Sequence, residues 1–152
     1  MICTVGYQLR SPHELVEQLL CAGVNVVVDV RETPWSQRPA CRKTALSKAL
    51  GEAGIEYLHA PFAGNPKRLR GVASSHAECL DLYTAYLAEH PEVRDQFSQL
   101  MSSLARTDRK ACLLCYERHP QDCHRTRLLD AVGLSDGVEH LGTEGAPRFL
   151  EV

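Results

Sequence analysis

Residues 24–30, Val-Asn-Val-Val-Val-Asp-Val, restrict the fold of this chain more than any other segment. The run is almost wholly apolar and β-branched, and polar residues do not alternate regularly within it. Such a run is typical of a strand buried on both faces, as the strands of a parallel sheet are. Because parallel strands need long crossover connections, usually helices, the segment predicts an α/β fold.

Strand and helix signals alternate along the rest of the chain. This order predicts a single α/β domain over residues 1–152, with a mainly parallel sheet flanked by helices on both faces in a Rossmann-like three-layer arrangement. The order of the strands in the sheet does not follow from the pattern. We expect strands at residues 2–6, 24–30, 55–59, 110–116 and 138–141, helices at 12–22, 43–53, 76–89, 91–106 and 122–132, and a loop at 60–75.

The first expected helix has the clearest boundaries. Ser11 is a good N-cap, Pro12 suits the first helical position, and Glu14 completes a capping box. Gly23 is placed to end the helix. Capping signals of this kind support the assignment of a helix independently of its apolar face.

Composition narrows the protein class. The formal net charge of −2 gives no global basic field that would attract nucleic acid. No stretch approaches the roughly 20 apolar residues that cross a bilayer, and the N-terminus lacks the charged region of a signal peptide. The seven cysteines are scattered through apolar patterns, which favours small core residues in a reducing compartment. We therefore expect a cytoplasmic protein without membrane contact.

Ligands of open parallel sheets bind beyond the carboxyl ends of the strands, so polar residues at strand ends are candidates for the functional site. Asp29-Val30-Arg31 ends the apolar strand. One interpretation is that Asp29 braces a loop by pairing with an arginine. The other is that Arg31 and Arg38, with Ser36 between them, bind a carboxylate or phosphate.

A second strand end, residues 115–125, holds most of the reactive side chains. Strand side chains alternate between faces, so Cys115 and Glu117 share one face while Cys112 points to the other. This alternation argues against a zinc site built on Cys112 and Cys115. A structural zinc site also needs a second ligand pair, and only Cys123-His124 is available for it. We expect no metal site here.

The start of the last helix adds to this cluster. If Asp122 is the N-cap, Cys123, His124 and Arg125 occupy the first turn, whose partial positive charge suits a phosphate or carboxylate. The same field favours a thiolate at Cys123. The alternative is structural: Arg125 pairs with Glu117 or Asp29, and Cys123 is merely packed.

Known loop patterns fit this segment poorly. A phosphatase-type loop needs a cysteine at residue 119, which is His119. A rhodanese-type loop starting at Cys115 would need glycine, and none lies before Arg125. No dinucleotide or P-loop motif is present, so the cofactor stays unknown. The basic run at residues 67–70 is either a lip over an anionic ligand or a solvated surface.

Four segments together resemble the domain-of-unknown-function-488 family. They occur in the family's order over most of the chain, and the last, C-x-E-x(2)-P-x(2)-C-H-R, is quite specific. The segments are Thr4-Val5-Gly6-Tyr7, Val28-Asp29-Val30-Arg31-Glu32-Thr33-Pro34-Trp35-Ser36, Gly54-Ile55-Glu56-Tyr57 with His59 and Pro61, and Cys115-Tyr116-Glu117 with Pro120 and Cys123-His124-Arg125.

The resemblance implies an α/β domain with its site at the same two strand ends, and no established activity. One departure concerns Tyr7, where relatives often carry histidine, followed here by Gln8 rather than a small hydroxyl residue. If that histidine donates a proton in relatives, this chain differs in its chemistry.

Three functions fit the clustering. The leading hypothesis is an enzyme for a small anionic ligand, phosphate-bearing or derived from nucleic acid. In it, Arg31, Arg38 and Arg125 hold the anion, Glu117 is the acid or base, and Cys115 or Cys123, with His124, supplies a nucleophile or a polar lining. The alternatives are a non-catalytic binding module with the same pocket, and a thiol redox or sulfur-handling protein that uses Cys115 and Cys123 as a pair.

Overall fold

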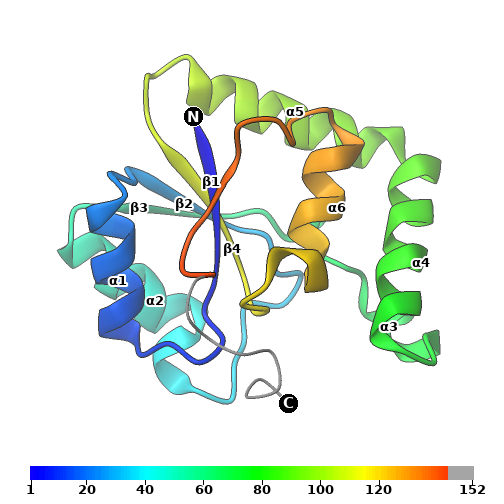
Figure 1. Ribbon diagram of the computed structural model, residues 1–152, viewed down its shortest axis with the longest axis horizontal. Coiled ribbons are helices and arrows are strands. Elements are labelled where there is room, and N and C mark those ends of the chain that lie inside the picture. Colours follow the sequence, from blue (N-terminus) through cyan, green and yellow to red (C-terminus); the bar gives the residue numbers. More distant parts are fainter. Residues whose placement is uncertain (144–152) are drawn as a thin grey trace.

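Five parallel strands form one sheet in the computed structural model, which describes residues 1–143. The strands follow the order β3-β2-β4-β1-β5, so β4 is the central strand and lies between β2 and β1 (Figure 1). The parallel α/β prediction is confirmed. The strands are β1 (Ile2–Gly6), β2 (Val26–Asp29), β3 (Glu56–His59), β4 (Ala111–Cys115) and β5 (Glu139–His140).

Helices cover both faces of this sheet and complete the three-layer arrangement (Figure 1). Helices α1 and α2 pack on one face, whereas α4, α5 and α6 pack on the other. The helices are α1 (Pro12–Cys21), α2 (Lys43–Glu52), α3 (Lys67–Val72), α4 (His76–Glu89), α5 (Pro91–Ala105) and α6 (His124–Ala131), with 3₁₀ turns η1 (Pro39–Cys41), η2 (Pro61–Ala63) and η3 (Pro120–Asp122).

Alternation along β4 divides the core in two. Cys112 and Leu114 belong to the layer under α1 and α2, and Leu113 and Cys115 belong to the layer under α4, α5 and α6. All five residues of β4 are buried, which is why its sequence shows no polar positions. Cys112 and Cys115 therefore face opposite layers, as the strand period predicts.

Several boundaries differ from the predicted ones. The predicted loop at residues 60–75 contains helix α3, because the short run Lys67–Val72 forms a single helical stretch after Pro66. The predicted N-cap, Asp122, instead ends the 3₁₀ turn η3, and α6 begins at His124 with Cys123 as its N-cap. Pro120 favours this turn because its fixed φ angle suits a first helical position.

Helix α1 begins as predicted. The Ser11 side chain accepts a hydrogen bond from the Glu14 backbone, and the Glu14 carboxylate accepts one from the Ser11 backbone. None of the helices within residues 1–143 combines the length and apolarity that a bilayer crossing requires.

Candidate functional site

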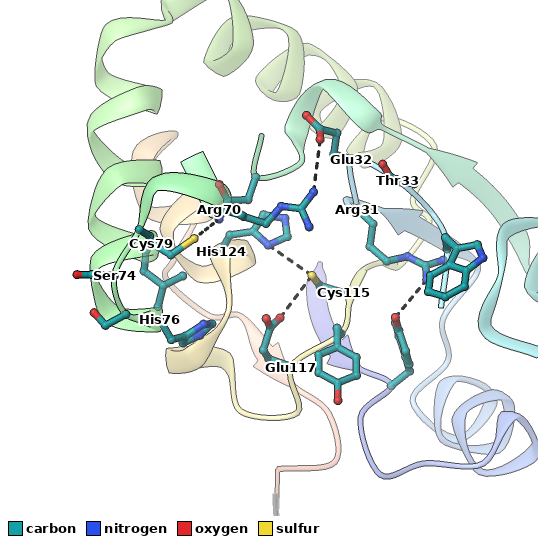
Figure 2. Close-up of a pocket in the computed structure, with 17 residues that line it drawn as sticks. Arg31, Glu32, Thr33, Arg70, Ser74, His76, Cys79, Cys115, Glu117 and His124 are labelled. Atoms are coloured by element: carbon teal, nitrogen blue, oxygen red, sulfur yellow. Dashed lines mark hydrogen bonds and ion pairs between the residues drawn. The ribbon is translucent and has the colours of Figure 1, made fainter. Parts of the chain in front are cut away.

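The candidate site is a cavity of about 450 Å³ at the carboxyl ends of the strands. The registers bring these ends together, since Gly6 of β1 is level with Cys115 of β4, and Asp29 of β2 is level with Leu114. Helices α3 and α4 form the opposite wall (Figure 2). The cavity is lined by Tyr7, Arg31, Glu32, Thr33, Trp35, Asn65, Arg70, Ala73, Ser74, Ser75, His76, Cys79, Leu80, Cys115, Tyr116, Glu117 and His124.

Asp29 and Arg31 form a buried ion pair beside the cavity. Arg31 donates from Nε to Asp29 Oδ1 at 2.9 Å and from Nη2 to Oδ2 at 2.7 Å, and the Tyr57 hydroxyl donates to the same carboxylate. Burial opposes the charge of Arg31, but Asp29 outweighs it and raises the pKa of the guanidinium. Burial and Asp29 also raise the pKa of Tyr57. The pair therefore braces the end of β2.

Arg31 also reaches the neighbouring loop. Its Nη1 donates to the Cys41 carbonyl at 2.9 Å and to the Tyr7 hydroxyl at 3.4 Å. Both ends of the guanidinium are thus engaged by the protein, although Arg31 lines the cavity. Tyr7, the residue of the first motif that departs from the pattern expected of relatives, is a cavity residue and contacts Arg31 directly.

Two other predicted ligand-binding residues lie outside the cavity lining. Arg38 donates to the Tyr7 carbonyl at 3.0 Å and to Cys41 Sγ at 3.1 Å. Ser36 accepts from the Arg38 backbone N–H at 3.1 Å. Both residues line a neighbouring pocket that shares Tyr7, Trp35 and Tyr116 with the main cavity. Their contacts hold the loop after β2 in place.

Arg125 is completely buried under the loop that follows β4. Its exposed fraction is 0%, and it donates to the carbonyls of Glu117 at 2.6 Å and Arg118 at 3.3 Å. It therefore fixes the backbone that carries Glu117. The structural alternative required a salt bridge from Arg125 to Glu117 or Asp29, and this salt bridge is absent among residues 1–143. The Arg125 guanidinium donates to backbone carbonyls instead.

Cys115, His124 and Glu117 meet at the cavity floor (Figure 2). Cys123 joins them through its contact with His124. Cys115 Sγ lies 3.4 Å from His124 Nδ1 and 3.7 Å from Glu117 Oε2, and Cys123 Sγ lies 3.7 Å from His124 Nδ1. The sequence predicted that these residues are close, and the structure brings all four together. Cys115, Glu117 and His124 line the cavity, while Cys123 lies behind them.

A backbone carbonyl fixes the orientation of the His124 ring. His124 Nε2 lies 2.9 Å from the Val30 carbonyl oxygen. Because a carbonyl can only accept, Nε2 carries a proton, and in the neutral ring the lone pair is on Nδ1. That lone pair faces the two thiols.

The four groups shift one another's protonation. The Cys123 hydrogen bond and burial raise the pKa of Cys115, whereas the Cys115 thiol and His124 lower the pKa of Cys123 against the effect of burial. The negative charge of Cys123 raises the pKa of His124, although burial opposes this. Burial and the charge of Cys123 raise the pKa of Glu117 to about 7. The floor can therefore hold or release protons near neutral pH.

Gly6 explains how the loop can lie so close to β1. A Cβ atom at Gly6 would stand 1.8 Å from the Glu117 carbonyl oxygen. The Tyr7 and Gln8 backbone N–H groups donate to the Cys115 and Tyr116 carbonyls at 3.1 and 2.9 Å. The glycine of the first motif and the glutamate of the last thus belong to one local structure.

One family model covers most of the residues that build this site. This family model, the domain of unknown function DUF488, matches residues 11–132. The chain belongs to the DUF488 family. Comparison with curated proteins and with solved structures yields no match. Membership brings no known activity, so the chemistry of this DUF488 protein has to be argued from its site.

The wall that α3 and α4 contribute to the DUF488 cavity follows from the sequence only in part, because one interpretation of the basic run at residues 67–70 was a lip over an anionic ligand. Arg70 lines the cavity and forms an ion pair with Glu32 at 3.5 Å, and the start of α4 contributes Ser74 and His76. The basic run at residues 67–70 was the one available signal. The serine and histidine carried none, because their place depends on how α4 packs against α6.

Proposed function

We propose that this DUF488 protein is an enzyme that binds a small anionic substrate in the cavity and exchanges a proton with it through Glu117. The supporting observation is the position of the Glu117 side chain. Its carboxyl group lies at the cavity floor, 3.7 Å from Cys115 Sγ, on a loop that Arg125 and Gly6 hold in place. A positioned carboxyl group in a cavity is a common general acid or base.

Arg70 is the cation best placed to bind the substrate. Its side chain is about half exposed (49%), and its Glu32 partner is 3.5 Å away. Such an exposed ion pair contributes little free energy, so Arg70 can exchange Glu32 for a ligand at small cost. This role replaces the one predicted for Arg38 and Arg125, which do not line the cavity and whose guanidinium groups donate to backbone carbonyls of the protein.

The surrounding groups favour an anion of modest size. Arg31 adds positive charge on the side of β2. The N-terminus of α4, which begins at His76, faces the cavity from the opposite wall together with the preceding Ser74 and Ser75. A helix N-terminus attracts anions through its partial positive charge and free N–H groups. A phosphate- or carboxylate-bearing metabolite matches this lining.

One experiment separates an enzyme from a binding module. A panel of phosphate- and carboxylate-bearing metabolites is incubated with the wild-type protein, the Glu117→Gln variant and a control, Glu52→Gln, on the exposed surface of α2. Mass spectrometry follows loss of each compound, and the melting temperature reports binding. We expect the wild type and Glu52→Gln to consume at least one compound, and Glu117→Gln to bind it but convert it at least about 100-fold more slowly.

Two results would contradict the proposal. If compounds bind but none is consumed, the cavity belongs to a binding module. If Glu117→Gln converts the substrate as fast as the wild type, the chemistry does not pass through this carboxyl group.

The two thiols favour a second candidate, a thiol redox protein. Cys115 Sγ and Cys123 Sγ lie within 4.8 Å of one another, so a small movement would let them form a disulfide. Mild oxidation followed by peptide mass spectrometry tests this candidate. A crosslinked 115–123 peptide that is reduced again by a dithiol supports it, and its absence removes it.

A further inference from the structure

The cavity floor has the composition of a catalytic metal site. We infer that Cys115, Cys123 and His124 bind a divalent zinc ion, with a fourth coordination position open to the cavity beside Glu117. The three ligand atoms all lie within 4.8 Å of one another, and all three residues are buried. Zinc sites with two cysteines, one histidine and a fourth exchangeable position are an established catalytic type.

The distances agree with tetrahedral coordination. With Zn–S near 2.3 Å and Zn–N near 2.0 Å, a tetrahedral ion separates its sulfur and nitrogen ligands by about 3.6 Å. The two corresponding separations here are 3.4 Å, between Cys115 Sγ and His124 Nδ1, and 3.7 Å, between Cys123 Sγ and His124 Nδ1. The two sulfur atoms lie within 4.8 Å of one another, and a tetrahedral ion would hold them about 3.8 Å apart, so they need approach by no more than about 1 Å to bind it.

The surroundings of His124 are those of a metal ligand. Histidines that bind metals commonly donate their other ring N–H to a carboxylate or a backbone carbonyl, which fixes the tautomer. His124 Nε2 does this with the Val30 carbonyl oxygen at 2.9 Å, so its Nδ1 lone pair is available to the ion. The Tyr83 ring, 5.2 Å from the imidazole between centroids, holds the ring from the side.

Charge in the site is consistent with zinc. Each thiol releases its proton to solvent as its sulfur binds the ion, and two thiolates then neutralise the two charges of Zn²⁺. A neutral cluster avoids the cost of a buried, unpaired charge.

This site differs from the one that the sequence argued against. The C-x-x-C pair of Cys112 and Cys115 cannot share an ion, because the two side chains face opposite layers of the core. Two of the three ligands come instead from residues 123 and 124 at the start of α6, which folds back against the end of β4. The sequence offered Cys123-His124 only as a second ligand pair for Cys112 and Cys115, so spacing alone did not show that they join Cys115 without Cys112.

The fourth coordination position is where the ion would take part in catalysis. Cys115, Glu117 and His124 line the cavity while Cys123 does not, so the open side of the cluster faces the cavity next to Glu117. A water bound there would become acidic, and Glu117 could accept its proton. The metal site stands on the three ligands; its catalytic use rests on the proposed function.

Zinc binding can be measured without a substrate. The chain is stripped with a chelator under reducing conditions, incubated with zinc chloride, passed through a gel-filtration column and analysed by elemental mass spectrometry. We expect about one zinc per chain in the wild type and at least a tenfold lower content in Cys115→Ala and Cys123→Ala. The control Cys112→Ala, a buried thiol on the other face of β4, keeps the zinc.

A spectroscopic measurement on the wild type tests the metal site even if the cysteine variants fail to fold. Cobalt(II) in place of zinc should give thiolate-to-metal charge transfer and the visible bands of a tetrahedral ion. Zinc should also slow the alkylation of Cys115 and Cys123 but not of Cys79, which lines the opposite wall. Failure of the wild type to retain zinc, equal retention by all variants, or a 115–123 disulfide that forms equally fast with zinc present would each overturn the inference.

The outcomes also separate this inference from the proposed function. If the protein retains zinc but consumes no compound, the metal site is supported and the proposed enzymatic function is contradicted. If the protein still converts its substrate after complete removal of zinc, the enzymatic function is supported and a catalytic role of the metal is contradicted.

Discussion

Single residues hold the site in place through contacts that a one-atom change would break. Gly6 is the clearest example, because the loop that carries Glu117 passes directly over it. Asp29 is another, because its carboxylate is fully buried and holds both Arg31 and the Tyr57 hydroxyl. In both cases the residue positions its neighbours and does not itself contact the cavity.

Gly6→Ala should displace the loop after β4. The added Cβ would stand 1.8 Å from the Glu117 carbonyl oxygen, so we expect the free energy of unfolding to fall by about 2 kcal/mol or more. Urea denaturation measures the loss. Gly51→Ala is the matched control, because nothing lies within 4 Å of its new Cβ in α2 and its stability should rise by up to about 1 kcal/mol. Equal effects of the two changes would disprove this steric account of Gly6.

Asp29→Asn should be strongly destabilising. It leaves the buried Arg31 guanidinium without its counter-charge, and breaking such a pair costs about 3–5 kcal/mol. The control is Asp81→Asn, which removes an exposed pair with Arg127 and should cost less than about 1 kcal/mol. Chemical denaturation of both variants makes the comparison; a small loss for Asp29→Asn would mean that Arg31 finds another partner.

At the scale of elements, the sequence predicted those helix and strand boundaries that depend on neighbouring residues. The β-branched run of β2 predicted an interior strand, and the capping box predicted the start of α1. The structure contains both. Asp122 failed as a predicted N-cap because Pro120 starts a 3₁₀ turn there. The strand order and the approach of α3 and α4 to the cavity depend on long-range packing. His76 could therefore not be placed from the sequence, and Arg70 only by one of the two interpretations of its basic run.

The N-cap of α4 links stability to ligand binding. The Ser75 side chain accepts a hydrogen bond from the Glu78 backbone at 3.1 Å, and Ser75 also lines the cavity. Ser75→Ala should lower the free energy of unfolding by about 1 kcal/mol and should also weaken the stabilisation given by an anionic ligand. Ser11→Ala, at the cap of α1 away from the cavity, should cost a similar amount and leave ligand binding unchanged. Thermal denaturation with and without ligand separates the two effects.

At the scale of the whole molecule, the parallel sheet brings distant motifs to one edge. The ends of β1, β2 and β4 are level with one another, and α6 starts where they converge. The sequence could predict that Asp29, Cys115 and Glu117 belong to this edge, because carboxyl ends of parallel strands share it. It could not predict that Arg38 and Arg125 would bond to protein groups, since their partners include backbone carbonyls, which every residue carries and which leave no mark in the sequence.

The central claim, that this cavity attracts an anionic ligand, can be tested at Cys79, a partly buried cysteine on its wall. The measurement is the ratio of alkylation rates with iodoacetate and with neutral iodoacetamide, compared with the same ratio at the exposed Cys21. Differences in thiolate content cancel in this ratio. We predict a ratio at least about threefold higher at Cys79, as a local potential of roughly one kT would give, and its loss in Arg70→Ala. A ratio at Cys79 equal to or below that at Cys21 would contradict an anion-binding cavity.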